Sequence, residues 1–174
     1  MPPVEVEGAE IVVLSEEHRV ENFDCGDPAR NSWLCTRAFS NQRSDDTRTY
    51  VALRGNEVVG FHALTVGSIL RAAVPGPLRR NAADPVSYVL LAQLAVVTRH
   101  QRQGISGELI RHAMGQAARI AEIVGCRLFA VHPGRSGLVD YYRKFGFVPT
   151  ETVPPLMVIS MQEVRRILNA VGDD

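Results

Sequence analysis

The feature that most constrains the fold of this chain is a change of hydrophobic period between Ser87 and Val124. Residues 86–97 are almost continuously apolar, which is typical of a strand buried on both faces. After a short basic turn, apolar residues recur at steps of three or four, which predicts an amphipathic helix. These residues are Ile105, Leu109, Ala113, Ala117, Ile120 and Val124. Gly125 is a suitable residue to end that helix.

The turn between this strand and this helix is a candidate anion-binding site. Amides in the first turn of a helix have no partners inside the helix, and the helix dipole is positive there. Arg99, Arg102 and Arg111 add positive charge beside the turn. The segment Gly104–Gly107 does not have the glycine spacing of a dinucleotide site, and a P-loop would need a lysine that is absent here. We therefore expect a phosphorylated ligand of another kind.

Length and composition indicate a globular protein of one domain, residues 1–174. Hydrophobic residues make up 45% of the chain, but no apolar run reaches the roughly 20 residues of a membrane span. The three cysteines, Cys25, Cys35 and Cys126, are odd in number and lack metal-ligand spacing, so we expect a cytoplasmic protein without disulfides. The five histidines share no ligand spacing, and we assign no metal. The formal net charge is zero, so nucleic-acid binding would depend on local patches.

Local patterns predict the remaining elements in chain order. Asp27 followed by Pro28 is a typical helix start, and the apolar residues Trp33, Leu34 and Ala38 predict the buried side of that helix. We expect the helix to run to about Phe39 and to end in Ser40-Asn41-Gln42, with Arg43 following it. The other expected elements are a strand at 10–14, a hairpin of 49–53 with 57–66, a loop at 75–85, a strand at 127–131, a helix at 136–145, a strand at 158–160 and a helix at 162–170.

Two motifs in this order resemble the GNAT acetyltransferase superfamily. Gln101-x-x-Gly104-x-Ser106, preceded by a strand end at Leu94–Val96, resembles the acyl-CoA motif Arg/Gln-x-x-Gly-x-Gly/Ala. The segment Val139–Phe147 resembles the family segment that ends Phe-Tyr-x-x-x-Gly-Phe. The resemblance implies the GNAT acyl-CoA N-acyltransferase fold, which is a mixed α/β (α+β) fold with a mostly antiparallel central sheet flanked by helices. It also implies acetyl-CoA as the cofactor.

The same resemblance implies roles for individual residues. Leu94, Ala95 and Val96 would line the pantetheine and the thioester, and Tyr142 would protonate the departing thiolate. The backbone of the turn would hold the pyrophosphate, with the contributing residues Gln101, Arg102, Gln103, Gly104, Ile105, Ser106 and Gly107. Tyr142 also has a structural interpretation, as a packed helix tyrosine with a satisfied hydroxyl.

A narrower resemblance links most of the chain to the TacT-type acetyltransferase toxins. It is carried by Phe23-x-Cys25-Gly26, Trp33-Leu34, Asn41-Gln42, Val59-Gly60-Phe61 and Leu78-Arg79-Arg80. Toxins of this family acetylate the amino group of aminoacyl-tRNA and are usually paired with a ribbon-helix-helix antitoxin. The chain differs from their pattern at Gln93, Val97 and Pro133, where they generally have Arg, Asp and often Ala. Ser106 differs from the Gly or Ala of the superfamily acyl-CoA motif.

This resemblance implies aminoacyl-tRNA as the substrate and a homodimer as the assembly. The candidate RNA-binding residues are Asn41, Arg43, Arg71, Arg79, Arg80, Arg143 and Lys144. The central strand contains no carboxylate to act as a base, which favours a weakly basic amine such as an α-amine, with a pKa of about 7.7–8.0. Two alternatives stay open. One is a stand-alone GNAT enzyme acting on a small amine, antibiotic, peptide or protein, and the other is a non-catalytic acyl-CoA-binding module.

Overall fold

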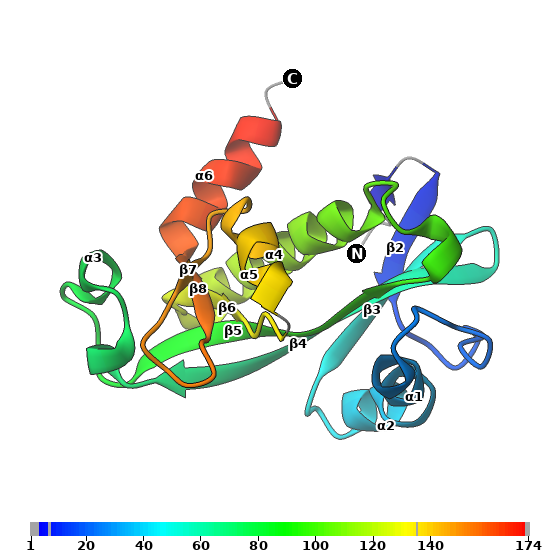
Figure 1. Ribbon diagram of the computed structural model, residues 1–174, viewed down its shortest axis with the longest axis horizontal. Coiled ribbons are helices and arrows are strands. Elements are labelled where there is room, and N and C mark those ends of the chain that lie inside the picture. Colours follow the sequence, from blue (N-terminus) through cyan, green and yellow to red (C-terminus); the bar gives the residue numbers. More distant parts are fainter. Residues whose placement is uncertain (1–3, 7, 135, 173–174) are drawn as a thin grey trace. The chain divides into compact units, whose positions relative to one another are not determined.

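The computed structural model describes residues 4–6, 8–134 and 136–172, which divide into two compact units. Unit 1 contains Met1–Thr65 and Ala92–Ala113, and unit 2 contains Val66–Leu91 and Met114–Asp174. Three elements run from one unit into the other: strands β4 (Glu57–Ile69) and β5 (Val86–Val96) and helix α4 (Ile105–Val124) (Figure 1). The predicted strand and amphipathic helix are β5 and α4, and α4 ends before Gly125 as expected. Strand β5 is less buried than predicted, because Ser87 is exposed and Leu90 and Leu94 are only half-buried.

The sheet in unit 1 has the strand order β1-β2-β3-β4-β5. The first four strands each pair antiparallel with the next one along the chain; they are β1 (Val4–Val6), β2 (Ala9–Val13), β3 (Arg48–Arg54) and β4. The Val97 N–H donates to the Val59 carbonyl at 2.9 Å. A Cβ atom on Gly60 would lie 3.0 Å from Leu109 Cδ1 and 3.2 Å from the Ala95 carbonyl oxygen, so a larger residue here would force these neighbours to shift by a few tenths of an ångström.

The first helical region of unit 1 differs from the prediction. Two helices, α1 (Pro28–Thr36) and α2 (Ala38–Arg43), replace the single helix expected to end at about Phe39. They are separated at Arg37, whose backbone φ of −119° departs from helical geometry. Figure 1 shows them as two short helices in succession.

The contacts of these helices agree with their expected buried side. The Asp27 carboxylate caps α1 by accepting from the Ala29 N–H at 3.0 Å. Leu34 and Ala38 are buried, and the Trp33 ring stacks on Phe61 with centroids 5.9 Å apart. The local apolar pattern therefore identified the correct face even though it missed the helix break.

The sheet in unit 2 has the strand order β4-β5-β6-β8-β7. Strand β6 (Leu128–Val131) pairs parallel with β5 and antiparallel with β8 (Met157–Ser160), which pairs antiparallel with β7 (Val148–Pro149). The predicted mixed, mostly antiparallel sheet is confirmed. Its core in unit 2 is formed by Ile69, Val74, Ala82, Val86, Leu128, Ala130, Leu156 and Val158.

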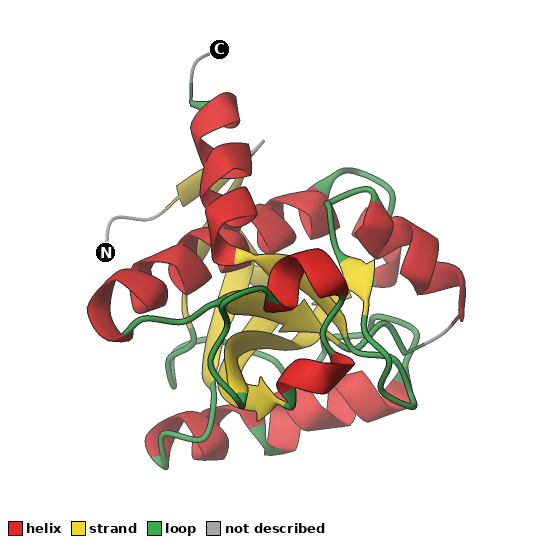
Figure 2. Cartoon of the chain, turned by 90° about the vertical axis from the view of Figure 1, so that its left-hand side faces the viewer, coloured by secondary structure: helices red, strands yellow, loops and turns green. Residues whose placement is uncertain are grey.

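Unit 2 also contains helices α5 (Ser136–Arg143) and α6 (Met161–Val171), and α6 precedes the C-terminus (Figure 2). The segment expected to be a loop at 75–85 includes the short helix α3 (Gly76–Arg79), after a 3-10 turn at Arg71–Ala73. A four-residue helix carries too little periodicity to be seen in the sequence. Within the described ranges, no helix is both long enough and apolar enough to cross a membrane.

Candidate active site

The predicted anion-binding turn forms in unit 1. After β5 and the 3-10 turn Thr98–His100, the chain reaches Arg102 and Gly104, which both have a left-handed backbone with φ of 62° and 87°. Helix α4 then begins, and the Gly104 carbonyl accepts from the Glu108 N–H at 3.2 Å. This backbone geometry is typical of an anion-binding site.

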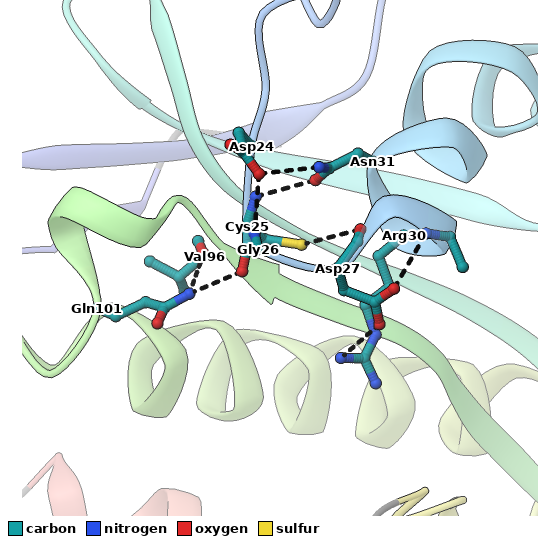
Figure 3. A network of polar contacts seen from close by, with 9 residues as sticks. Asp24, Cys25, Gly26, Asp27, Arg30, Asn31, Val96 and Gln101 are labelled. Atoms are coloured by element: carbon teal, nitrogen blue, oxygen red, sulfur yellow. Dashed lines mark hydrogen bonds and ion pairs between the residues drawn. The ribbon is translucent and has the colours of Figure 1, made fainter.

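The Gln101 side chain joins the turn to the segment before α1. Its Nε2 donates to the carbonyls of Cys25 and Val96, both at 3.0 Å (Figure 3). The Thr98 N–H also donates to the Asp24 carbonyl at 3.0 Å. The side-chain nitrogen of Gln101 is therefore engaged with protein carbonyls, and any contribution of this residue to phosphate binding comes from its backbone.

Asp24 and Asn31 stabilise the segment that Gln101 contacts, and the sequence interpretation missed both. The Asp24 carboxylate accepts from the Gly26 N–H at 2.9 Å and from Asn31 Nδ2 at 3.0 Å. Asn31 Oδ1 in turn accepts from the Cys25 N–H at 2.9 Å (Figure 3). The hydrogen bond from Gly26, followed by the one from Asn31, lowers the pKa of Asp24. A short polar residue two positions before a glycine is the local signal for such a turn.

A cavity of about 210 Å³ lies beside the turn, lined in part by Arg54, Gly104, Gly107 and Arg111. Arg54 Nη1 lies 2.9 Å from His100 Nδ1. Because a guanidinium only donates, that histidine nitrogen is the acceptor and carries no proton. Arg54 was not predicted, and it brings a guanidinium to the start of α4 from the end of β3. The cavity therefore offers charge and backbone amides that fit a phosphate group.

Two of the other basic residues near the turn are already paired. Arg99 forms an ion pair with Glu57, and Arg111 forms one with Glu108 at 2.8 Å. Both pairs are solvent-exposed, so a bound phosphate could compete for these guanidinium groups at low energetic cost. Arg99 and Arg111 would therefore contribute to phosphate binding, as predicted, only if they exchanged these carboxylate partners for the phosphate.

The strand end predicted to line the cofactor directly precedes the turn in unit 1. Ala95 and Val96 are buried, and Leu94 is half-buried. The Val96 carbonyl accepts from Gln101, whereas its neighbour Val97 donates to β4 through its N–H. Hydrogen bonds at Val96 and Val97 therefore hold the end of this strand in place.

Tyr142 lies on α5 in unit 2, where its side chain is only 5% exposed. Its ring makes edge contacts with Tyr141 and Phe147, with centroid distances of 5.4 and 5.8 Å. The Tyr142 carbonyl accepts from the N–H groups of Phe145 and Phe147, at 3.0 and 3.3 Å. The ring position is thus fixed by an aromatic cluster and by the turn that ends α5.

Two candidate RNA-binding residues belong to unit 1. Asn41 and Arg43 lie inside α2, not after a helix end as expected. Arg43 is exposed, and the Asn41 carbonyl accepts from the Asp46 N–H at 2.8 Å. The adjacent Gln42 has a structural role, since its side chain bonds the Leu14 carbonyl at 2.7 Å and the Thr49 N–H at 3.0 Å.

The remaining RNA-binding candidates belong to unit 2. Arg71, Arg79 and Arg80 lie in one short segment, and the first two donate to the carbonyls of Ala82 and Ala72. Unit 2 adds a residue that was not predicted, Arg127, whose Nη2 donates to the Arg80 carbonyl at 2.7 Å. The last two candidates, Arg143 and Lys144, are exposed at the end of α5. Among the residues that the structure describes, no cluster of His, Cys, Asp and Glu could hold a metal ion.

We expect Gly104→Val to weaken acetyl-CoA binding at least about tenfold. The left-handed backbone costs a residue with a Cβ on the order of 1–2 kcal/mol, and valine is among the least tolerant. No described atom lies within 4 Å of a Cβ added here, so within the protein the cost comes from the backbone conformation and not from a clash. Gly104→Asn should lose less affinity because asparagine tolerates this conformation.

Calorimetry with acetyl-CoA measures this effect. Gly115→Val on the same helix is the matched control, since a Cβ there also has open space and the backbone is not left-handed. Equal affinities for Gly104→Val and Gly115→Val would show that the turn does not hold the cofactor.

The family model for the acetyltransferase (GNAT) domain matches residues 45–149. A tRNA-acetylating toxin of Mycobacterium tuberculosis is 34% identical over 155 residues, which are 89% of this chain and 93% of the toxin.

Two solved structures show the similarity of fold. AtaT complexed with acetyl-methionyl-tRNAfMet has a TM-score of 0.85 at 24% identity, covering 91% of this chain and 98% of AtaT. An AtaT variant bound to the C-terminus of the antitoxin AtaR and acetyl-CoA has a TM-score of 0.80 at 22% identity, covering 92% and 98%. These likenesses confirm the predicted fold.

Proposed function

Because the chain belongs to the GNAT acetyltransferase family, we propose that it transfers the acetyl group of acetyl-CoA to the α-amino group of aminoacyl-tRNA. The observation that supports this choice of substrate is the 34% identity to a tRNA-acetylating toxin across about nine-tenths of both chains. The backbone of the turn and the arginine-lined cavity beside α4 support the cofactor. The extent of the match also supports a single domain over residues 1–174.

Acetyl-CoA supplies the acetyl group as an activated thioester. The chain's own part is to bind and orient it: the amides of Gln101–Gly107 hold the pyrophosphate, and the strand end Leu94–Val96 lines the pantetheine and thioester. This assignment depends on backbone groups, which agrees with the engagement of the Gln101 side chain in protein hydrogen bonds. Arg54 and Arg111 add positive charge to the phosphate side of the turn.

The chemistry requires a neutral amine and a proton for the departing thiol. An α-amine with a pKa of about 7.7–8.0 is partly neutral at pH 7, so water suffices to accept its proton. The amine nitrogen bonds to the carbonyl carbon, the carbon–sulfur bond breaks, and the Tyr142 hydroxyl donates its proton to the thiolate. A phenol with a pKa of about 10 and a thiol near 8.5 are close enough for this transfer.

Positive side chains would hold the RNA. We assign this role to Arg79 and Arg80, assisted by Asn41, Arg43, Arg71, Arg143 and Lys144. The Arg79→Ala, Arg80→Ala double variant should weaken binding of charged tRNA and flatten its dependence on log salt by about one to two units. The substitution keeps the Arg80 carbonyl that bonds Arg127, so the segment keeps its anchor.

Filter binding across a salt series measures this change. Arg119→Ala, an exposed arginine on α4, is the control, and acetyl-CoA affinity should be the same in all three proteins. An unchanged salt slope in the double variant would remove Arg79 and Arg80 from the RNA-binding surface.

We further propose a cytoplasmic toxin that forms a homodimer and is paired with a ribbon-helix-helix antitoxin. The support is the tRNA-acetylating toxin and the AtaT structure that contains the C-terminus of its antitoxin. Size measurement in solution tests the dimer. Co-expression with a small protein encoded beside this gene tests the antitoxin, which should restore growth.

The decisive experiment for the substrate uses labelled acetyl-CoA and charged tRNA. We expect a labelled N-acetyl amino acid after hydrolysis of the ester bond, and arrest of translation when the protein is expressed. Efficient acetylation of a small amine without any label on charged tRNA would instead favour a stand-alone enzyme. The central-strand residues Gln93 and Val97, which differ from the toxin pattern, would then explain the different acceptor.

A further inference from the structure

The zero net charge of the chain conceals an unequal division between its two units. Unit 2 contains ten basic and seven acidic residues, for a formal charge of +3, whereas unit 1 contains nine basic and twelve acidic residues, for a formal charge of −3. A polyanion is attracted to local positive potential and not to the average of the molecule. Unit 2 is therefore the part of the chain suited to bind a nucleic-acid backbone.

Unit 2 contains a cavity of about 310 Å³, bordered by α3, by the residues just before β6 and by the first turns of α6. Its polar lining comes from Arg127, Ser160, Gln162 and Arg165, and the Leu78 and Cys126 side chains contribute to its walls. None of the described side chains that line it is acidic. We call it the arginine cavity.

Arg127 is held in place at this cavity by backbone carbonyls. Its Nε donates to the Leu78 carbonyl at 3.4 Å and its Nη2 donates to the Arg80 carbonyl at 2.7 Å. A guanidinium has five N–H donors in a planar fork, so these two bonds orient the group and leave donors for an anion. The same bonds join Arg127 to the segment that carries Arg79 and Arg80.

Arg165 supplies a second guanidinium from α6. Its side chain is exposed and forms no ion pair with any residue that the structure describes. The next residue, Arg166, is different: its Nε and Nη2 make a bidentate pair with Glu163, at 2.9 and 2.6 Å. Two adjacent arginines on one helix thus differ in whether their charge is already neutralised.

We propose that the arginine cavity binds a backbone phosphate of the tRNA, and that it extends the RNA-binding surface from Arg79 and Arg80 to α6. This inference rests on the proposed function and names a further contact for the same substrate. Two guanidinium groups in a cavity that has no acidic lining residue suit the planar, bidentate recognition of a phosphate group. A backbone phosphate carries no sequence information, so the contact should bind different tRNAs equally.

The test compares Arg165→Ala with Arg166→Ala, using uncharged tRNA as the probe. Arg165→Ala should weaken tRNA binding about fivefold at 0.1 M salt and reduce the slope of log affinity on log salt by about one unit. Arg166→Ala should stay within about twofold of the wild type, with its slope unchanged, because its charge is already paired. Thermal unfolding and acetyl-CoA affinity should be the same in all three proteins.

Several results would overturn the inference. Equal weakening by both variants would indicate a general charge effect, and a loss of acetyl-CoA affinity in Arg165→Ala would assign the cavity to a cofactor phosphate. Tighter binding of duplex DNA than of tRNA, lost in Arg165→Ala, would identify DNA as the ligand. If Arg165→Ala acetylated charged tRNA normally and bound tRNA with unchanged affinity, the contact at the arginine cavity would be rejected, but the proposed function would not. A wild type that neither binds nor acetylates tRNA would reject the proposed function with it.

Discussion

Replacing Tyr142 with phenylalanine is expected to lower turnover about 100-fold or more while acetyl-CoA affinity stays unchanged. The substitution removes only the hydroxyl that would protonate the departing thiolate. The ring would keep its edge contacts with Tyr141 and Phe147, so the aromatic cluster of unit 2 stays intact. Single-turnover kinetics at saturating acetyl-CoA and calorimetry of acetyl-CoA binding separate the two quantities.

Tyr141→Phe is the matched control, because it removes the same atom from the adjacent ring of the same helix. That variant should retain turnover within about threefold of the wild type. If Tyr142→Phe also stayed within about threefold, the phenol would not be the acid and the residue would have only a packing role. If Tyr142→Phe lost acetyl-CoA affinity as well, its effect would be structural.

A second large effect is expected from two buried histidines in unit 1. His62 on β4 is completely buried, and its Nε2 lies 2.9 Å from Nδ1 of His112 on α4. The Tyr50 ring stacks against His62 with centroids 4.9 Å apart. Burial lowers the pKa of His112 to about 4 and, together with the neighbouring His112, lowers the pKa of His62 well below its ordinary value. The folded protein therefore holds both rings neutral.

These lowered pKa values predict that the protein loses stability as the pH falls below about 6.5. The unfolded chain binds protons at the ordinary histidine pKa, whereas the folded chain binds them only at lower pH, so acid favours unfolding. The stabilisation is complete above pH 6.5 and declines toward pH 4. Between pH 7 and pH 5, His112 alone should reduce the free energy of unfolding by on the order of 2 kcal/mol, and His62 adds to this loss.

Urea unfolding followed by circular dichroism at several pH values measures this decline. The double variant His62→Leu, His112→Leu should show a much flatter dependence, because two apolar side chains replace both partners of the hydrogen bond. His132→Gln, at an exposed histidine after β6, should retain the wild-type slope. A double variant as acid-sensitive as the wild type would assign the effect to other groups. The pKa values of Asp24 and Glu163 are also lowered, but the stability that these carboxylates contribute is lost only as the pH falls below their ordinary values of 3.8 and 4.5, which lie below the interval from pH 7 to pH 5.

The sequence by itself determined the elements whose signals are local. The change of hydrophobic period located β5, the turn and α4, because strand and helix periods are properties of neighbouring residues. The Asp27-Pro28 pair predicted the start of α1 for the same reason, since a helix cap uses groups two or three residues apart. Strands β1 and β7 were missed, because three and two residues are too few to show a hydrophobic period.

Only the tertiary structure decided which distant residues meet. Gln101 bonds the carbonyl of Cys25, 76 positions away, Arg127 bonds that of Arg80, 47 positions away, and His62 meets His112 across 50 positions. Each residue alone has an ordinary interpretation as a surface or core side chain. Their pairing depends on the order of strands in the sheet and on the face that each helix covers. The strand order and the covered faces are determined by hydrophobic burial over the whole chain, so no local sequence pattern predicts them.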